Sequence, residues 1–166
     1  MNTASNLILG FDPGLNVTGW GAIKSHGNRE EHISHGTIVT KNQQILGVRL
    51  NTIFEQVSDL CRKYSPSSIA VEKIFSNKNP DSTIKLGKAR GIIFLVAARY
   101  NIEIFEYSPN TVKKNLVGYG HAEKSQIIYM INRFFSIKEK ISHDSADALA
   151  VAICHSMQKQ SKIKVV

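Results

Sequence analysis

Short apolar runs and longer helical repeats alternate along the chain. Apolar or alternating runs bounded by turn residues predict strands, and they cover 7–11, 17–24, 31–40, 68–72 and 101–106. Apolar residues spaced three and four apart predict helices, and they cover 45–64, 81–99, 122–135 and 143–158. The order is three strands, a helix, a strand, a helix, a strand and two helices. It predicts an α/β fold in which a mixed five-stranded sheet is flanked by helices.

Length and composition limit the number of domains. With 166 residues and 42% hydrophobic content, the chain is long enough for one hydrophobic core. No internal repeat or linker interrupts it, so we assign 1–158 to a single domain and expect the basic end, 159–166, to be a flexible tail. The longest apolar stretch, 92–98, is far shorter than the roughly 20 residues that span a bilayer, and the N-terminus lacks the pattern of a signal peptide.

The charge balance indicates a class of partner, and the cysteines indicate the redox environment. The 21 lysines and arginines against 13 aspartates and glutamates give a formal charge of +8. This balance favours a polyanionic partner, either nucleic acid or an anionic membrane surface. Cys61 and Cys154 show no metal-binding spacing and lie in apolar helical segments, so we expect buried free thiols in a reducing cytosol.

Acidic residues stand at the ends of two apolar strands. Asp12 follows the run 7–11, and Glu72 is the last residue of 68–72. A carboxylate at the end of a buried strand is costly unless something compensates its charge, and strand ends are where the functional groups of α/β sheets gather. Each acid also has a structural explanation, since Asp12 suits the turn before Pro13 and Gly14, and Glu72 suits a solvated strand end.

A pair of aspartates lies in the last predicted helix. Without Asp144 and Asp147 this helix is apolar almost all round, which is typical of a buried helix. Three residues separate the two acids, so they project from the same side of the first turns. Asp144 also suits a helix cap or the helix dipole, but Asp147 lies a turn further in, where capping no longer applies. A bound cation explains the pair better.

Carboxylate oxygens are the preferred ligands of hard cations such as Mg²⁺ and Mn²⁺. Two such ions about 4 Å apart can hold the attacking water and the leaving oxygen of a phosphoryl transfer. We therefore expect a nuclease in which two Mg²⁺ ions, replaceable by Mn²⁺, are bound by four catalytic carboxylates: Asp12, Glu72, Asp144 and Asp147. No Ser-His-Asp order, zinc motif or Walker loop competes with this hypothesis. His143 is a further candidate for a general base, although a partly exposed histidine is the simpler interpretation.

Several segments match one known family in the same order. They include GFDPG at 10–14, TGWG at 18–21, VEKIF at 71–75, NPDSTIKLGKARG at 79–91, VKK at 112–114, VGYG at 117–120, AEKSQ at 122–126 and DSADALA at 144–150. Together they resemble the RuvC family of bacterial Holliday-junction resolvases over roughly 7–157. The resemblance implies an RNase H-like fold, a homodimer, and paired symmetric nicks in opposing strands of a four-way DNA junction during recombination and repair. It also implies that the protein works beside the RuvA–RuvB branch-migration complex.

The resemblance also implies roles for single residues. All four family carboxylates fall on the acids named above, the DNA-binding lysines near the family's active site match Lys113 and Lys124, and its base-stacking aromatic residue matches Phe75. Stacking on a base is worth about 1–3 kcal/mol; alternatively, Phe75 packs under Lys78 and anchors its loop. The departures from the family are minor: a lysine at 73 where Gln is common, and a proline at 80 that interrupts the following loop.

Lysines and an apolar helix complete the candidate DNA-binding and dimer surfaces. Lysines that can form a basic surface around the acids, and so neutralise phosphates, are Lys78, Lys85, Lys88, Lys113, Lys114 and Lys124. Of these, Lys78 and Lys85 join Phe75, Lys113 and Lys124 as DNA-binding candidates. The segment 91–98 is apolar all round, so one face can cover the sheet and another a partner subunit; alternatively, it is buried wholly within the monomer.

Three other functions are compatible with parts of the sequence. An actin-like or sugar-kinase ATPase shares the Asp-Pro-Gly hairpin, but it needs two such domains and this chain supplies one. A non-catalytic junction-binding protein predicts the loss of at least one acid, and none is lost. The nearest alternative is a related RNase H-like nuclease that processes structured RNA, against which Phe75 and the Asp144–Asp147 pair favour the junction enzyme.

Overall fold

A five-stranded sheet and five helices make up the described part of the chain. The structure is a computed structural model that describes residues 6–27, 29–74 and 80–163, with side chains described as far as residue 160. Its elements are β1 (Asn6–Asp12), β2 (Val17–His26), β3 (Arg29–Val39), α1 (Leu46–Tyr64), β4 (Ser68–Glu72), α2 (Pro80–Arg99), β5 (Glu103–Tyr107), α3 (Pro109–Val117), α4 (Lys124–Phe135) and α5 (His143–Ile163).

The strands form one mixed sheet in the order β3-β2-β1-β4-β5. The meander of β1, β2 and β3 is antiparallel, whereas β4 lies parallel to both β1 and β5. The predicted mixed five-stranded α/β sheet is therefore confirmed. Because β1 and β4 are central and covered on both faces, they read as continuous apolar runs rather than alternating ones.

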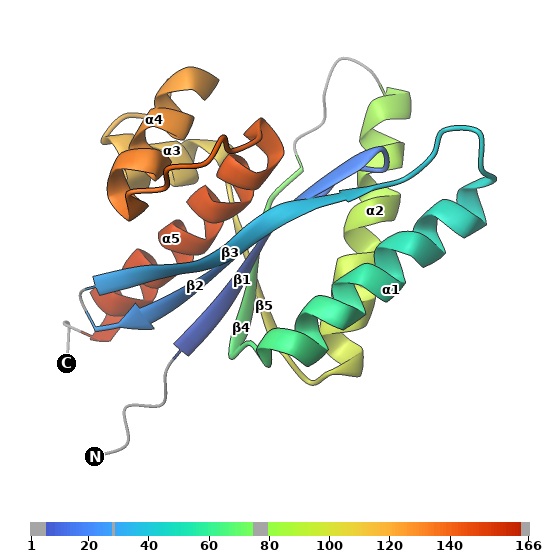
Figure 1. Ribbon diagram of the computed structural model, residues 1–166, viewed down its shortest axis with the longest axis horizontal. Coiled ribbons are helices and arrows are strands. Elements are labelled where there is room, and N and C mark those ends of the chain that lie inside the picture. The colour runs from blue at the N-terminus through green and yellow to red at the C-terminus, as the bar shows by residue number, and fades with distance from the viewer. Residues whose placement is uncertain (1–5, 28, 75–79, 164–166) are drawn as a thin grey trace.

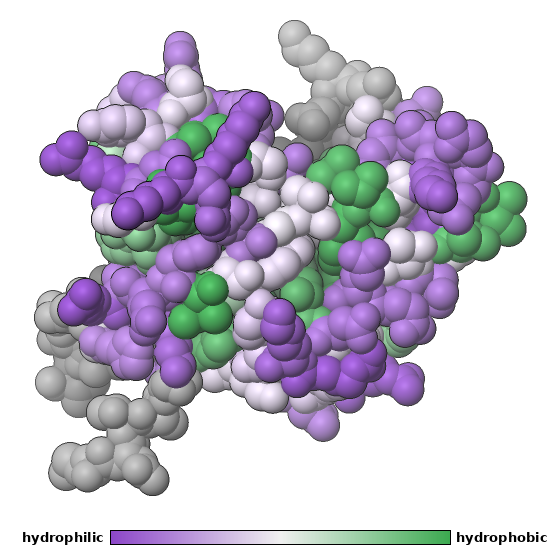
Figure 2. Space-filling model, in the orientation of Figure 1, coloured by the Kyte–Doolittle hydropathy of each residue, from purple (hydrophilic) through white to green (hydrophobic). Residues whose placement is uncertain are grey.

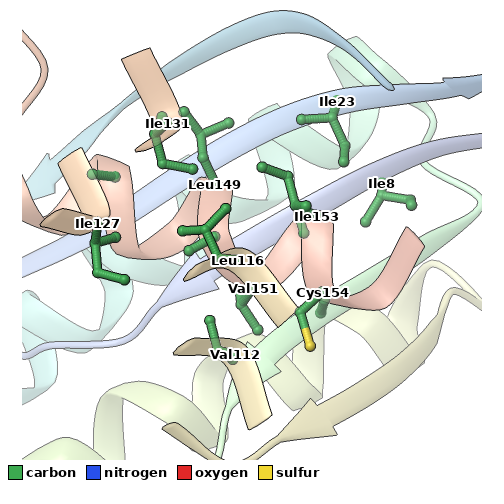
Figure 3. Close-up of a cluster of buried hydrophobic side chains, with 14 of the residues drawn as sticks. Ile8, Ile23, Val112, Leu116, Ile127, Ile131, Leu149, Val151, Ile153 and Cys154 are labelled. Carbon is green, nitrogen blue, oxygen red and sulfur yellow. The ribbon is translucent and has the colours of Figure 1, made fainter. Parts of the chain in front are cut away.

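Helices cover the two faces of the sheet as separate layers (Figure 1). α1 and α2 lie on one face, and α3, α4 and α5 on the other. Each layer forms a separate hydrophobic core with its face of the sheet. On the α5 side, residues of the sheet such as Ile8 and Ile23 pack with Leu149 and Ile153 of α5 and with Leu116 of α3 (Figure 3). On the opposite side, Leu9, Phe11 and Val71 pack with α1 and α2.

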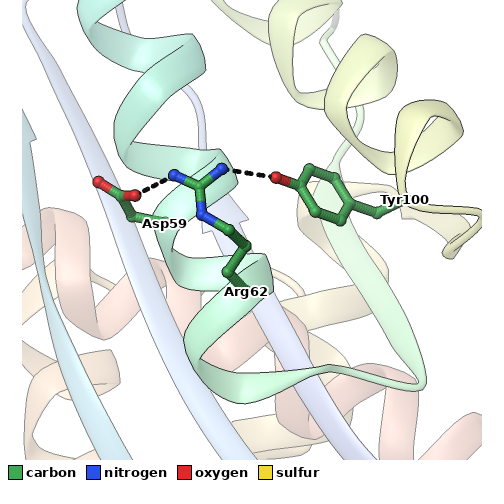
Figure 4. A network of polar contacts seen from close by, with 3 residues as sticks. All are labelled: Asp59, Arg62 and Tyr100. Atoms are coloured by element: carbon green, nitrogen blue, oxygen red, sulfur yellow. Dashed lines mark hydrogen bonds and ion pairs between the residues drawn. The ribbon is translucent and has the colours of Figure 1, made fainter.

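Polar contacts join the two helices of the α1–α2 layer to each other and to the sheet. Arg62 of α1 forms an ion pair with Asp59 one turn earlier and donates a hydrogen bond of 2.7 Å to the hydroxyl of Tyr100, just after α2 (Figure 4). Arg90 of α2 forms an ion pair with Glu106 of β5. The Arg62 contacts are exposed to water, so we expect them to contribute little to stability.

Three expectations about element boundaries are corrected. The helix α3 was not predicted, although Ser108 caps its first turn, proline 109 follows and Gly118 ends it in the left-handed region, which are ordinary start and stop signals. α5 continues to Ile163, so the first part of the predicted tail, 159–163, is helical, and 164–166 lie outside the described residues. Pro80 does not interrupt a loop but begins α2, where its missing N–H costs nothing.

Both cysteines are buried free thiols, as expected. Burial raises the pKa of Cys61 and of Cys154 to about 11, so both are protonated at neutral pH. Among the described residues, no helix has the length and apolar character needed to cross a membrane.

Candidate active site

Asp12 and Glu72 are neighbours because their strands are parallel. In the register of β1 and β4, Phe11 pairs with Val71, so the acids that follow these two residues stand side by side at the strand ends. Successive strand residues alternate between faces. Since Phe11 and Val71 point into the α1–α2 core, Asp12 and Glu72 point to the other face, which α5 covers.

Glycines in β1 and β2 allow α5 to lie directly against this face. A Cβ atom on Gly10 would stand 2.0 Å from the carbonyl oxygen of Ala148, and one on Gly19 would stand 2.0 Å from that of Asp144. Any side chain at these positions would push the helix off the sheet. A glycine inside a strand pattern is a recognised signal of such a close backbone approach.

The beginning of α5 therefore reaches the two strand ends. Ser142, not Asp144, caps this helix, because its hydroxyl accepts a hydrogen bond of 3.1 Å from the amide of Ser145. The capping explanation for Asp144 is thus wrong. Asp147 lies one turn further along, between Ala146 and Ala148, which are both buried against the sheet.

Three of the four acids surround one hollow of about 270 Å³. Asp12, Glu72 and Asp147 line it together with Lys113 of α3 and Lys124 of α4. A second hollow, of about 410 Å³, lies on the other side of Asp12. Its lining residues include Asp12, Asp144 and Lys85 of α2. Asp12 thus borders both hollows, and Asp144 lies on the α2 side of the group.

The loop after Asp12 is held by hydrogen bonds from outside it. The Thr18 hydroxyl donates to the carbonyl of Gly14 at 2.7 Å. Arg49 of α1 donates to the carbonyl of Leu15 at 3.2 Å and to the side-chain oxygen of Asn16 at 2.5 Å. Sequence reasoning missed Arg49, because its position relative to this loop depends on how α1 packs on the sheet.

The acids resist ionisation. Burial is the largest cause that raises the pKa of Asp12 from 3.8 to about 8; the negative charges of Asp147, Glu72 and Asp144 raise it further, and Lys124 acts in the opposite direction. A like charge nearby and a low-polarity environment both disfavour the charged form of a carboxyl group. Shifted values of this size are typical of functional sites.

The other acids of the first hollow show the same behaviour. Burial, followed by the charge of Asp147, raises the pKa of Glu72 from 4.5 to about 7, and Lys113 and Lys124 lower it. Burial also raises the pKa of Asp147, against the opposing effect of Lys124. The two predicted lysines are therefore close enough to act on the carboxylates. They do not neutralise the group, whose acids remain harder to ionise than in water.

Three of the predicted DNA-binding residues line these hollows. Lys113 and Lys124 line the first hollow and Lys85 lines the second. Phe75 and Lys78 lie outside the described residues.

The two histidines of α5 lie in different surroundings. His143 begins α5, is exposed and lies close enough to Asp147 to lower the pKa of that acid. His155 is buried beneath the sheet, where its ring makes hydrogen bonds of 3.0 Å with Ser68 and 2.7 Å with the hydroxyl of Tyr107. It is therefore part of the core and not of either acidic hollow.

A larger hollow of about 880 Å³ lies at the far end of the sheet. It is lined by the β2–β3 hairpin and the end of α4, with residues such as His32 and Phe135. It contains none of the four acids. Size alone does not identify the chemical site here, because the converging carboxylates with shifted pKa values lie elsewhere.

The carboxylates form a donor set that fits a hard cation. Within 6–27, 29–74 and 80–163, no three His, Cys, Asp or Glu side chains are gathered closely enough to hold a metal ion as they stand. However, the ligands around the first hollow are oxygen donors alone, which suit Mg²⁺, and burial together with repulsion between the carboxylates disfavours their ionised form. A divalent cation would offset this repulsion and favour the ionised acids.

The sheet order and the position of the acids define a class of protein. Carboxylates on the first and fourth strands and on the last helix, at one end of a sheet ordered β3-β2-β1-β4-β5, characterise an RNase H-like fold of the nuclease type. The chain belongs to the RuvC family, because the family model of crossover junction endodeoxyribonuclease RuvC matches residues 8–155.

Individual proteins agree with this assignment. The chain is 41% identical over 160 residues to crossover junction endodeoxyribonuclease RuvC of Legionella pneumophila, covering 96% of this chain and 92% of that one. It is 46% identical over 155 residues to the Wolbachia protein of the same name, covering 93% and 96%. Among solved structures, it is similar to Thermus thermophilus RuvC in complex with a Holliday junction substrate, with a TM-score of 0.89 and 26% identity over 95% of this chain and 96% of that one.

Proposed function

We propose that this chain is a Holliday-junction resolvase, a structure-specific DNA endonuclease that acts in recombination and repair. Membership of the RuvC family supports this activity, and the Thermus thermophilus relative is a complex with a Holliday junction substrate. The observation that carries the proposal is the convergence of Asp12, Glu72 and Asp147 from three separate elements on one hollow that also receives Lys113 and Lys124.

The four carboxylates bind two Mg²⁺ ions in this proposal, and Mn²⁺ can take their place. Asp12 lies between both hollows, with Glu72 and Asp147 on one side and Asp144 on the other, so it is the natural shared ligand. When bound, such ions lower the pKa of a coordinated water and stabilise charge on the oxygens of the reacting phosphate. The carboxylates supply the charge that holds the ions, and ionisation of Asp12 at neutral pH depends on that counter-charge because its pKa is about 8 without it.

The lysines are placed to hold the phosphate backbone. Lys113 and Lys124 share the first hollow with the acids, so they can neutralise the charge of the phosphate that is cut. Lys85 borders the second hollow beside Asp144 and suits a neighbouring phosphate. We assign Phe75 to stacking on a base at the crossover, and Lys78 to DNA contact, from the family resemblance alone.

We propose a homodimer formed through the exposed face of α2. Ile84 and Leu95 are 55% and 56% exposed, and a side chain added at Gly87 or Gly91 would meet open space. These four residues recur at helical spacing and so share one face, while Ile93 and its buried neighbours face the sheet. A two-fold dimer repeats the acidic site, which suits paired cuts in opposing strands. Figure 2 shows that apolar patches interrupt an otherwise polar surface of the molecule.

Other features of the proposal follow from the family. We expect a single nuclease domain over residues 1–158, a bacterial cytoplasmic location where chromosomal DNA is available, and cooperation with the RuvA–RuvB branch-migration complex. The RuvA–RuvB expectation is tested by co-sedimentation of the three proteins on a four-way junction.

The activity is tested by cleavage of labelled substrates in Mg²⁺. A synthetic four-way junction is compared with duplex DNA, an RNA–DNA hybrid and structured RNA. We expect paired symmetric nicks in the junction alone. Preferential cleavage of structured RNA would replace the proposal by the RNA-processing alternative, and cleavage of none of the four by the parental chain, with junction binding retained, would favour a non-catalytic binding protein.

A further inference from the structure

A polar hollow of about 620 Å³ lies on the side of α3 away from the acids. Its lining consists of Asn110, Thr111, Lys114, Asn115, Gly118, Gly120, His121 and Gln158. The same helix therefore borders two hollows. Lys113 turns into the acidic hollow and the next residue, Lys114, turns into the polar one. Nothing in the proposed catalytic chemistry uses the polar hollow.

The lining of the polar hollow has the composition of an anion site. It contains a lysine and a histidine, three side-chain amides and a threonine hydroxyl, but no aspartate or glutamate. Lys114 and His121 are exposed, so their nitrogen atoms can meet a ligand without rearrangement of the core. Lysine, asparagine, glutamine and threonine side chains are the groups that commonly contact backbone phosphates of nucleic acids.

Glycines at the rim of the polar hollow leave room for a ligand to approach the backbone. Gly118 ends α3 with a φ of 95°, and a Cβ atom there would meet nothing within 4 Å. At Gly120 the nearest atom to an added Cβ is 3.7 Å away, in Asn110. Glycine leaves the peptide groups bare, which lets a phosphate approach the backbone. The loop between α3 and α4 therefore offers main-chain as well as side-chain donors.

The distance between the hollows suits a nucleic-acid strand that runs from one to the other. Asp147 and Gln158 are both on α5, eleven residues apart, so they are separated by about 16 Å at about 1.5 Å per residue. One strand of duplex DNA both advances about 3.4 Å per nucleotide along the axis and turns around it, so the polar hollow lies within a few nucleotides of the reacting phosphate. α3 packs against α5 and borders both hollows.

We propose that the polar hollow holds a backbone phosphate of the DNA arm that leaves the active site, with Lys114 as its positively charged contact and the ring of His121 as a hydrogen-bond donor. This inference rests on the proposed function, because it assumes a DNA strand in the acidic hollow. The proposed site holds one arm of the junction. It lies apart from the four carboxylates and makes no contact with a base. Its contribution is to affinity and register, as expected of phosphate contacts.

Salt-dependent DNA binding provides the first test. The variant Lys114→Ala/His121→Ala is compared with the parental protein in Ca²⁺, on a four-way junction and on duplex DNA. Loss of this phosphate contact should weaken binding about five- to tenfold and reduce the slope of log K against log salt by about 1. Lys138→Ala, which removes an exposed lysine that lines neither hollow, is the matched control and should change neither quantity. An unchanged salt slope in the double variant overturns the proposal.

A chemical change in the DNA locates the contact. Junctions are made with a single uncharged methylphosphonate at successive positions along the arm. At one position, within a few nucleotides of the cut, the substitution should weaken binding of the parental protein but leave the double variant unaffected. If no position shows this coupling, the hollow does not hold a phosphate, even if DNA binding is intact. Failure of the proposed function has a different signature, because the parental protein would then fail to nick the junction in Mg²⁺.

Discussion

Replacing Asp12 by asparagine should abolish cleavage and yet stabilise the metal-free protein above neutral pH. In the unfolded chain Asp12 loses its proton near its ordinary pKa of 3.8, whereas in the folded protein burial and three neighbouring acids raise the pKa to about 8. Between these values the folded state binds more protons than the unfolded state, so its stability falls as the pH rises. Above about pH 8 the full cost is present. Glu72, whose pKa is raised to about 7, adds to the same trend.

The size of the effect follows from the pKa difference. At about 1.4 kcal/mol per pKa unit, ionisation of Asp12 costs the fold up to about 6 kcal/mol. Asparagine has nearly the same shape but carries no charge, so it removes this cost. The net gain is smaller, because the buried amide of asparagine also costs free energy unless it finds hydrogen-bond partners, and we expect a gain of about 2–4 kcal/mol near pH 8.5. Near pH 3, where Asp12 is protonated in the folded state and largely protonated in the unfolded chain, the two proteins should differ by less than about 1 kcal/mol.

The measurement is urea or thermal unfolding in EDTA at several pH values. A gain of about 2 kcal/mol corresponds to a Tm increase of about 4–8 °C for a chain of this size. Asp59→Asn is the matched control, because this exposed carboxylate is paired with Arg62 and its removal should not stabilise the protein. Mg²⁺ should raise the Tm of the parental protein and have little effect on Asp12→Asn. Equal stability of parent and Asp12→Asn at pH 8.5 would refute the account of the acids as an uncompensated cluster.

Four further changes test the site, the packing and the assembly. Asp147→Asn should reduce the single-turnover rate of junction cleavage by more than about a thousandfold while junction binding in a gel-shift assay changes less than about threefold; cleavage at the parental rate would contradict the metal-site proposal. Ca²⁺ in place of Mg²⁺ should permit junction binding without turnover, since its coordination is larger and less regular, and strong cleavage in Ca²⁺ alone would count against the two-ion site. Gly10→Ala should destabilise the fold by about 2–4 kcal/mol in urea unfolding, because its Cβ would overlap the backbone of α5, whereas Gly47→Ala, in open space on α1, should be neutral or stabilising. Leu95→Asp should yield a folded monomer in analytical ultracentrifugation; a dimer of unchanged affinity would place the interface elsewhere.

The elements and the identity of the acids could be predicted from the sequence, because both depend on local patterns. Alternation and helical spacing act over a few residues, so the strand at 68–72 was predicted with its observed bounds. Asp12, Glu72 and Asp147 stood out because they interrupt apolar segments. The helix over 109–117 was missed, although its cap and proline were visible, since a short segment has little periodicity. The same local reasoning put the end of the last helix five residues too early.

Only the tertiary structure decided how these residues meet. The parallel register of β1 and β4 places Asp12 beside Glu72, and no local pattern specifies which strands will pair. Gly10 and Gly19 let the backbone of α5 touch the sheet, which brings Asp147 to the same hollow and leaves Asp144 on the α2 side. The raised pKa values arise from that proximity and from burial, both of which exist only after the chain has folded. The sequence alone thus predicted which groups carry the chemistry, and long-range packing determined how close they lie, their mutual repulsion and the hollow that they line.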